Sequence, residues 1–128
     1  PNGATQLLAV LPNNPSLFNS LRVKFPDLKI IRTTSPLDGN SIWMEVFPLD
    51  VSKAYGISWL CSNEILCGIK DVTSIGNDFN DLDMLELTNI SYVVANAPSE
   101  LRERYKVVPS NDENGFSVAV NDALANHQ

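Results

Sequence analysis

The chain has 128 residues, of which 44% are hydrophobic, as is typical of a globular protein with its own core. Fifteen acidic and nine basic residues give a net charge of −6, which argues against nucleic acid as a partner because such binders carry a basic stripe. There is no signal-peptide pattern, and no apolar run approaches the ~20 residues that cross a bilayer. We therefore predict a cytoplasmic protein with no membrane partner.

The N-terminal part of the sequence predicts a small α+β unit with the order β-α-β-β. A β-like apolar run covers residues 5–11. Asn14 and Pro15 then mark the start of a helix, as its N-cap and its first helical residue. Strands are predicted over 28–33 and 42–47, and the turn cluster between them predicts an antiparallel hairpin.

The composition shifts near Pro48, so we predict a first domain over residues 1–50 and a second over 51–128. In the second domain, helical and strand-like segments alternate. The helices are expected over 53–61 (capped by Ser52), 81–88, 99–105 (capped by Ser99) and from Gly115 to residue 125; the strands over 72–75, 92–95 and 106–108. This alternation predicts an α/β fold, with a parallel sheet and helices on its faces.

The turn after the predicted strand over 72–75 is rich in side-chain oxygens. After Gly76, its polar residues are Asn77, Asp78, Asn80 and Asp81. Open α/β sheets place ligands where a strand ends in a glycine turn and opens a helix, and carboxylate and amide oxygens suit Mg²⁺. The alternative is that these residues are only acidic caps of an ordinary helix. A single cap explains one acidic residue, however, and not four polar residues directly after a strand. An EF-hand calcium loop does not fit, because Leu82 falls at loop position 5, which requires an oxygen ligand, and Asp83 falls at position 6, which requires glycine.

Lys53 and Asn96 are further candidates because of where they lie. Lys53 opens a helix, where a cation opposes the helix dipole; it is either a solvated surface lysine or a residue facing a phosphoryl group held by the acidic turn. Asn96 follows the strand over 92–95. Since parallel strands end at one rim of a sheet, Asn96 is expected near Asp78, although a plain turn residue is equally consistent.

The sequence lacks the residue patterns of several other kinds of functional site. Cys61 and Cys67 have the wrong spacing for a zinc site, and His127 is the only histidine, so we expect two reduced thiols and no zinc. The sequence contains neither a nucleophile elbow nor a phosphate-binding P-loop.

Four segments resemble motifs of the Cof-type phosphatases of the haloacid dehalogenase-like (HAD) superfamily, and they occur in that family's order. Residues 45–54 resemble its third motif, in which a lysine opens a helix. Residues 75–85, with the sequence IGNDFNDLDML, resemble its fourth, acidic motif. The remaining segments are 93–98 and the loop over 110–116. Residues 1–50 resemble the second half of the mobile cap of this subclass.

The resemblance implies half of a Rossmann-like core preceded by a partial α+β cap. It also implies a Mg²⁺-dependent phosphatase that acts on a small phosphorylated metabolite through an aspartate nucleophile. The implied residues are Lys53 and Asp81 for catalysis, Lys53, Asn80 and Asn96 for substrate, and Asn77, Asp78 and Asp81 for the metal. Many relatives carry Gly-Asp where this chain has Gly76-Asn77. The direct ligand is therefore left open among Asn77, Asp78 and Asp81, and Asp81 could instead act from behind the ligands.

The family's first motif, an Asp-x-Asp with the nucleophile, is absent, and so is the second. We therefore expect a C-terminal fragment that is inactive alone, whose partner is the missing N-terminal half of the same protein. Self-association of the fragment through its uncovered surface is also expected. Two other functions remain open at this point: a non-catalytic module that binds a phosphorylated ligand or a partner chain, and a plain domain with acidic caps.

Overall fold

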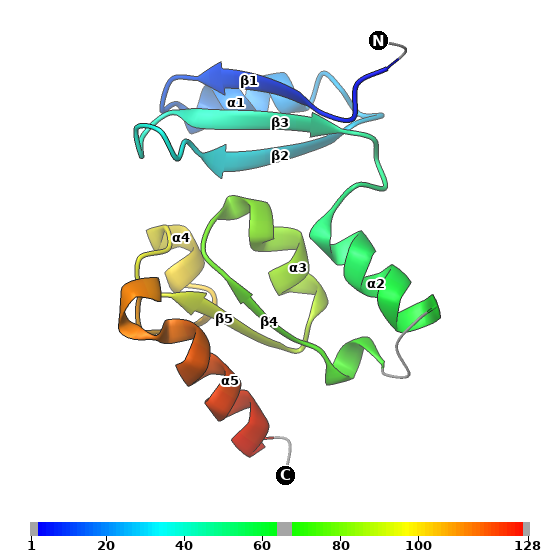
Figure 1. The fold of residues 1–128 in the computed structure, drawn as a ribbon. Helices are drawn as coiled ribbons and strands as arrows, with labels where there is room; N and C mark the ends of the chain where they lie inside the picture. The colour runs from blue at the N-terminus through cyan, green and yellow to red at the C-terminus, as the bar shows by residue number, and fades with distance from the viewer. Residues whose placement is uncertain (1–2, 64–67, 127–128) are drawn as a thin grey trace. The chain divides into compact units, whose positions relative to one another are not determined.

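The computed structural model describes residues 3–63 and 68–126 (Figure 1). It divides into two compact units, Pro1–Ser52 and Lys53–Gln128. The sequence places the boundary two residues earlier, after residue 50. The assignment of the two parts as cap and core stays a prediction.

The first unit is a three-stranded antiparallel sheet with one helix. Its elements are β1 (Leu7–Leu11), α1 (Pro15–Arg22), β2 (Lys29–Thr34) and β3 (Ile42–Phe47), and the strand order is β1-β3-β2. The predicted hairpin is confirmed, because β2 and β3 pair antiparallel from Lys29–Phe47 to Thr34–Ile42. The sequence did not predict that β1 pairs with β3 on its other edge.

The start of α1 follows from local chemistry. Asn14 Oδ1 accepts a hydrogen bond of 3.0 Å from the backbone N–H of Leu17, and Pro15 takes the first helical position, as the sequence predicts. The helix then buries Phe18 against Ile42 and Met44 of the central strand, which makes the core of this unit.

The turn between β2 and β3 is closed by Asp38. Its carboxylate accepts hydrogen bonds from the Ser41 hydroxyl and from the backbone N–H groups of Asn40 and Ser41, which hold the pKa of Asp38 well below its usual range. Gly39 has a φ of +64°, the left-handed conformation that glycine adopts most easily. The sequence predicts a turn over residues 36–40, and the structure shows that the Asp38 side chain closes it through Asn40 and Ser41.

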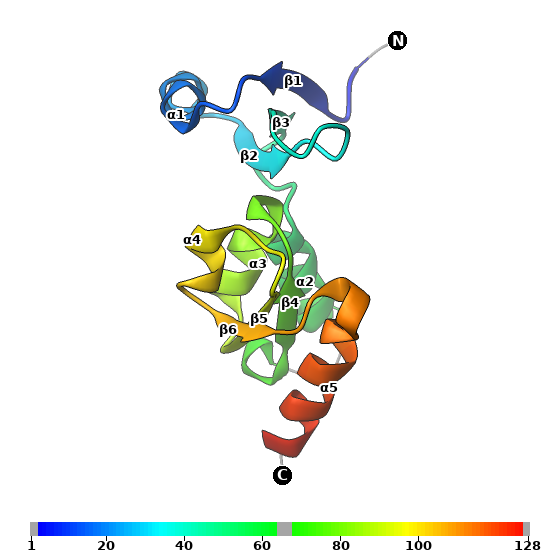
Figure 2. The ribbon, with the colours of Figure 1, turned by 90° about the vertical axis from the view of Figure 1, so that its left-hand side faces the viewer.

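The second unit is a parallel sheet with helices on both faces (Figure 2). Its helices are α2 (Lys53–Asn63), α3 (Leu82–Leu87), α4 (Ser99–Arg102) and α5 (Gly115–Asn126), and its strands are β4 (Thr73–Gly76), β5 (Ile90–Val94) and β6 (Lys106–Val108). Short 3₁₀ turns occupy Ile69–Asp71, Phe79–Asp81 and Asn111–Glu113. The strand order is β4-β5-β6, and both pairings are parallel. The predicted α/β class is therefore confirmed.

One cap prediction is wrong. The structure places Pro98 at the N-cap of α4 and Ser99 inside the helix, and α4 ends at Arg102 rather than at 105. The Ser99 hydroxyl instead contacts the carboxylate of Glu100 at 3.2 Å. Pro98 has φ −51° and ψ 145°, an extended conformation that already supplies the turn into the helix.

Apolar residues on both faces of this sheet make the core of the second unit. Tyr92 and Val93 of β5 are almost fully buried, between Leu85 and Leu101 from α3 and α4 and Ala119 from α5. The helices α3 and α4 lie on one face and α5 on the other (Figure 2). The sheet that leads into the turn after β4 is thus covered by helices on both faces.

A polar network fixes α5 to the sheet. The hydroxyl of buried Tyr92 donates a hydrogen bond to Asp122 of α5, and Lys106 Nζ lies 2.6 Å from the same carboxylate oxygen. The hydrogen bond to Asp122, together with burial, raises the pKa of Tyr92 to about 12. Hydrogen bonds from Lys106 and Tyr92 lower the pKa of Asp122. Tyr92 therefore remains a donor, and Asp122 an ionised acceptor, across the neutral pH range.

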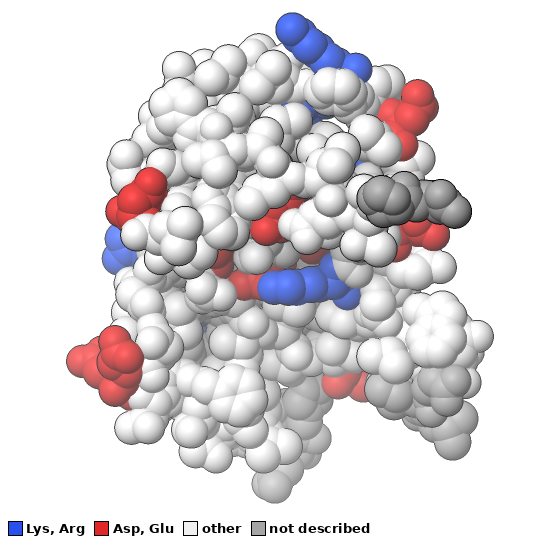
Figure 3. Space-filling view, turned by 45° about the horizontal axis from the view of Figure 1, so that its top comes forward, with Lys and Arg blue, Asp and Glu red and all other residues white. Residues whose placement is uncertain are grey.

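On the face shown in Figure 3, the acidic and basic side chains of the described residues are scattered, with no large patch of one sign. Within residues 3–63 and 68–126, no helix combines the length and the apolar character that a bilayer crossing requires.

Candidate functional site

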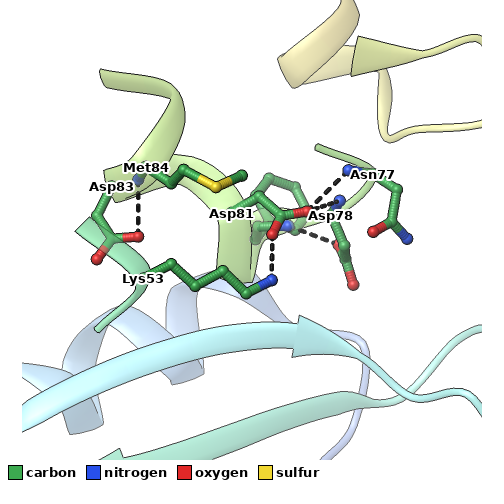
Figure 4. A network of polar contacts seen from close by, with 7 residues as sticks. Lys53, Asn77, Asp78, Asp81, Asp83 and Met84 are labelled. Carbon is green, nitrogen blue, oxygen red and sulfur yellow. Dashed lines mark hydrogen bonds and ion pairs between the residues drawn. The ribbon is translucent and has the colours of Figure 1, made fainter. Parts of the chain in front are cut away.

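The turn after β4 and the start of α2 meet at a buried carboxylate, that of Asp81 (Figure 4). Asp81 is 3% exposed. One of its oxygens, Oδ1, pairs with the ammonium of Lys53, the first residue of α2. The other, Oδ2, accepts backbone N–H groups from Asn77 at 2.8 Å and from Asp78 at 3.4 Å. The Asp81 side chain thus connects the turn after β4 to Lys53, which lies 28 positions earlier in the chain.

These contacts engage both oxygens of Asp81. Its carboxylate closes the backbone of the turn on one side and holds the lysine on the other, so Asp81 has the geometry of a positioning residue. The side chain of Lys53 is 50% exposed, while its ammonium pairs with the buried carboxylate. A lysine with a partly exposed side chain beside a turn rich in polar groups can bind an anion such as a phosphoryl group.

Gly76 allows this close approach of the turn to Asp81. A Cβ at this position would lie 2.8 Å from Asp81 Cβ and 3.1 Å from both Asp81 Oδ2 and Leu85 Cδ1. Such distances are shorter than van der Waals contact, so any side chain here must displace Asp81.

We expect Gly76→Ala to destabilise the chain by about 1–3 kcal/mol through overpacking. Urea unfolding of the purified chain measures the change. Gly56→Ala is the matched control, because a Cβ at Gly56 meets nothing within 4 Å and the residue lies inside α2. That control is expected to leave the chain as stable as wild type or up to about 1 kcal/mol more stable. Equal stability of the two variants would contradict the packing described at Gly76.

Asn77 and Asp78 carry the other oxygens of the turn. Asn77 is exposed, whereas Asp78 is 8% exposed, and its Oδ1 accepts the backbone N–H of Phe79 at 2.8 Å. Amide and carboxylate oxygens are the donors that a hard divalent cation prefers. In the part of the chain that the structure describes, no three His, Cys, Asp or Glu side chains converge as a complete metal site. The turn therefore provides a partial set of oxygen ligands.

Asn80 and Asn96 lie in different settings. Oδ1 of Asn80 is buried and accepts no hydrogen bond from the described residues, which is uncommon for a buried polar atom. Asn96 is exposed and clasps Asn111 through two hydrogen bonds, of 2.6 Å from its amide and 3.4 Å to its carbonyl oxygen. The clasp holds the loop before α5 against the end of β5. The expected proximity of Asn96 to Asp78 stays a prediction.

An open pocket of about 390 Å³ lies at the carboxyl ends of β4 and β5. Its lining residues are Ile75, Gly76, Asn77, Val94, Asn111, Asn114, Phe116 and Ser117. The pocket thus shares Asn77 with the candidate site. Sequence analysis identified the loop over 110–116 only by its family resemblance and did not single out Asn111 or Phe116. These two residues are far from β4 in the sequence, and the fold brings them to the same pocket.

The sequence predicts two reduced thiols and no zinc site. Cys61 lies half-buried in α2 and forms no disulfide with a described residue. Cys67 and His127 lie outside the described residues.

Comparison with known proteins decides the family. The sequence matches the haloacid dehalogenase-like hydrolase family over residues 4–120. The chain belongs to this family. It is 30% identical over 105 residues to a protein of Haemophilus influenzae named "Putative phosphatase", and 30% identical over 99 residues to the stress response protein YhaX of Bacillus subtilis. These matches cover 80% and 77% of this chain but only 37% and 32% of the relatives.

Solved HAD structures share the fold. A protein of Bacteroides thetaiotaomicron, analysed among the phosphatases of the HAD superfamily, has a TM-score of 0.74 at 19% identity, covering 94% of this chain and 42% of that one. A HAD/COF-like hydrolase of Plasmodium vivax has a TM-score of 0.69 at 24% identity, covering 97% and 43%. The predicted HAD resemblance and fold class are confirmed, and the chain spans about a third of the curated relatives it matches.

Proposed function

We propose that the protein containing this chain is a Mg²⁺-dependent phosphomonoesterase that acts on a small phosphorylated metabolite. The observation that carries the proposal is the pairing of Lys53 with Asp81 beside the oxygen-rich turn after β4. Membership of a hydrolase family and a relative named as a phosphatase support it. Because the chain spans only part of those relatives, the activity is proposed for the whole protein.

Lys53 binds an oxygen of the transferring phosphoryl group. Its positive charge neutralises the charge on the equatorial oxygens in the transition state, in which positioning and electrostatics supply most of the catalysis. Asp81 keeps the ammonium in place before substrate arrives, so little reorganisation is needed when the phosphoryl group binds. Asp81 is thus a positioning residue in this proposal rather than a direct metal ligand.

Asn77 and Asp78 would hold Mg²⁺ through their side-chain oxygens. A bound Mg²⁺ would add further neutralisation of charge on the phosphoryl oxygens. Mg²⁺ commonly uses only one or two protein carboxylates and completes its shell with water and substrate oxygens, so the partial set at this turn fits such an ion. Asn80, whose buried oxygen accepts no hydrogen bond from residues 3–63 or 68–126, and Asn96 are proposed to contact substrate.

The nucleophile is proposed to be an aspartate from outside these 128 residues. Its carboxylate oxygen forms a bond to phosphorus while the ester oxygen leaves and takes a proton. Water then cleaves the aspartyl phosphate to restore the carboxylate and release phosphate. The covalent intermediate divides one difficult displacement into two easier ones.

Phosphate release from a panel of small phosphomonoesters tests the function. The protein that contains this chain together with its nucleophile is expected to hydrolyse members of the panel with Mg²⁺ and to lose activity in EDTA. The 128-residue chain alone is expected to be inactive. Metal-independent hydrolysis by the whole protein, or its failure to hydrolyse any member of a broad panel, would contradict the proposal.

A further inference from the structure

The loop before α5 contains the dipeptide Asn114-Gly115, which has a chemistry of its own. Glycine has no side chain beside its nitrogen, so this nitrogen can attack the side-chain amide carbon of a preceding asparagine. The new N–C bond closes a succinimide ring, the C–N bond of the side-chain amide breaks, and ammonia leaves with the proton of the glycine N–H. Water then opens the ring at either carbonyl carbon and gives aspartate or isoaspartate.

The folded loop holds this dipeptide in a geometry that cannot react. Asn114 has φ 62° and ψ 29°, so the nitrogen of Gly115 lies on the side of the Asn114 main-chain nitrogen and away from Cβ. Ring closure requires that nitrogen and Cβ to lie on the same side of the Cα–C bond. The Gly115 N–H also donates a hydrogen bond of 3.0 Å to the carbonyl oxygen of Ser110. The reaction therefore requires a rotation of the backbone and the loss of this bond.

Close packing prevents that rotation while the loop over residues 110–115 is closed. Gly115 is buried, and a Cβ at this position would overlap the carbonyl oxygen of Pro109. At the start of the loop, Asn111 is clasped by Asn96 through the two hydrogen bonds described above. The loop must therefore open before the nitrogen of Gly115 can turn toward the side chain of Asn114.

We propose that Asn114 is a deamidation site, which the closed loop protects and which opening of the loop over 110–115 releases for reaction. The side chain of Asn114 is exposed, so water has access to it. The chemistry uses water alone and needs neither substrate nor metal, so it is independent of the proposed activity. Because loss of ammonia is irreversible, each opening adds to the modified fraction of the protein.

Deamidation changes the wall of the pocket at the ends of β4 and β5. Asn114 lines this pocket together with Phe116. Aspartate at position 114 adds a negative charge to the wall. Isoaspartate instead adds a carbon atom to the main chain directly before Gly115, where the backbone of Pro109 leaves no space for it. The isoaspartate product is therefore expected to lose the ordered start of α5.

Peptide mapping by mass spectrometry tests the inference on the protein that contains this chain, kept at mildly alkaline pH. Fragmentation of the peptides assigns the replacement of an amide by an acid to Asn114. We expect Asn114 to react at least about ten times more slowly without denaturant than in urea, because the rate follows the fraction of open loops. In urea, Asn2-Gly3, the same dipeptide elsewhere in the sequence, is expected to react at a similar rate.

Asn96→Ala opens the loop without changing the sequence around Asn114. It removes both hydrogen bonds of the clasp to Asn111, so the rate without denaturant should rise about 2- to 10-fold, while the rate in urea stays the same. Asn13→Ala is the matched control. It removes another hydrogen bond between exposed asparagine side chains, of 3.0 Å to Asn40 in the first unit, and should leave both rates unchanged.

Equal rates at Asn114 with and without urea would overturn the inference. An acceleration by Asn13→Ala as large as that by Asn96→Ala would do the same. Amide hydrogen exchange distinguishes opening of the loop from unfolding of the whole unit. We expect exchange over residues 92–94 of β5 to be unchanged by Asn96→Ala. Exchange there that rises in step with deamidation would show that the reaction proceeds through global unfolding, against the inference.

Discussion

Replacing Lys53 by alanine in the whole protein is expected to lower kcat/KM for a small phosphomonoester by about 100- to 1,000-fold, the usual cost of losing one preorganised charge contact to the transition state. The Lys53 side chain is half exposed and its ammonium is already held by the buried Asp81 carboxylate, so in the proposed function substrate meets a cation in position. Steady-state phosphate release at saturating Mg²⁺ measures the effect.

Lys70→Ala is the control for this substitution. Lys70 is an exposed lysine of the same unit, in the short turn Ile69–Asp71, and its removal changes the net charge by the same amount. Activity is expected to stay within about twofold of wild type, because distant surface charges are screened. If Lys53→Ala also stays within this range, Lys53 has no part in binding the phosphoryl group.

Replacing Asp81 by alanine is expected to destabilise the chain itself by about 2–4 kcal/mol. The substitution removes the acceptor for the backbone N–H groups of Asn77 and Asp78, and a buried donor left unsatisfied costs about 1–3 kcal/mol. It also leaves Lys53 without the partner that holds it. Urea unfolding followed by tryptophan fluorescence and circular dichroism gives the free energy of unfolding.

Asp112→Ala provides the comparison for Asp81. Asp112 is exposed, and its carboxylate accepts a hydrogen bond from the neighbouring Asn111 side chain at 3.0 Å. Its loss is expected to cost no more than about 0.5 kcal/mol. Equal destabilisation by the two substitutions would show that the Asp81 contacts contribute little to the fold.

Local signals in the sequence predict much of the fold. The Asn14-Pro15 pair locates the start of α1 because capping depends only on neighbouring residues. The same reasoning fails at Ser99, where the conformation of Pro98 takes over the cap. Contacts between distant residues leave no local pattern, so neither the pairing of β1 with β3 nor the Tyr92–Asp122 bond could be predicted.

The candidate site shows the same division. Sequence spacing predicts that Asn77, Asp78 and Asp81 follow one strand, and the structure places them there, in the turn after β4. Which of them faces a metal depends on how the backbone folds around each carboxylate. Asp81 turns inward to accept two N–H groups, and the missing side chain at Gly76 leaves the room for it.

The role of Asn96 also depends on a distant partner. Its position after β5 predicts a place at the rim of the sheet, but its hydrogen bonds to Asn111 arise from a loop 15 residues away. The clasp orders the wall of the pocket next to Asn77. A sequence pattern cannot reveal such a partner, because nothing near Asn96 in the chain encodes it.

A crystal structure of the whole protein with Mg²⁺ and beryllofluoride, a mimic of the phosphoryl group, is the most direct test of the site. We predict that Lys53 Nζ donates to a fluorine of the mimic, that Mg²⁺ is bound by an oxygen of Asn77 or Asp78, and that Asp81 keeps its contact with Lys53. A mimic bound elsewhere, with Lys53 and the 77–81 turn facing solvent, would contradict the account.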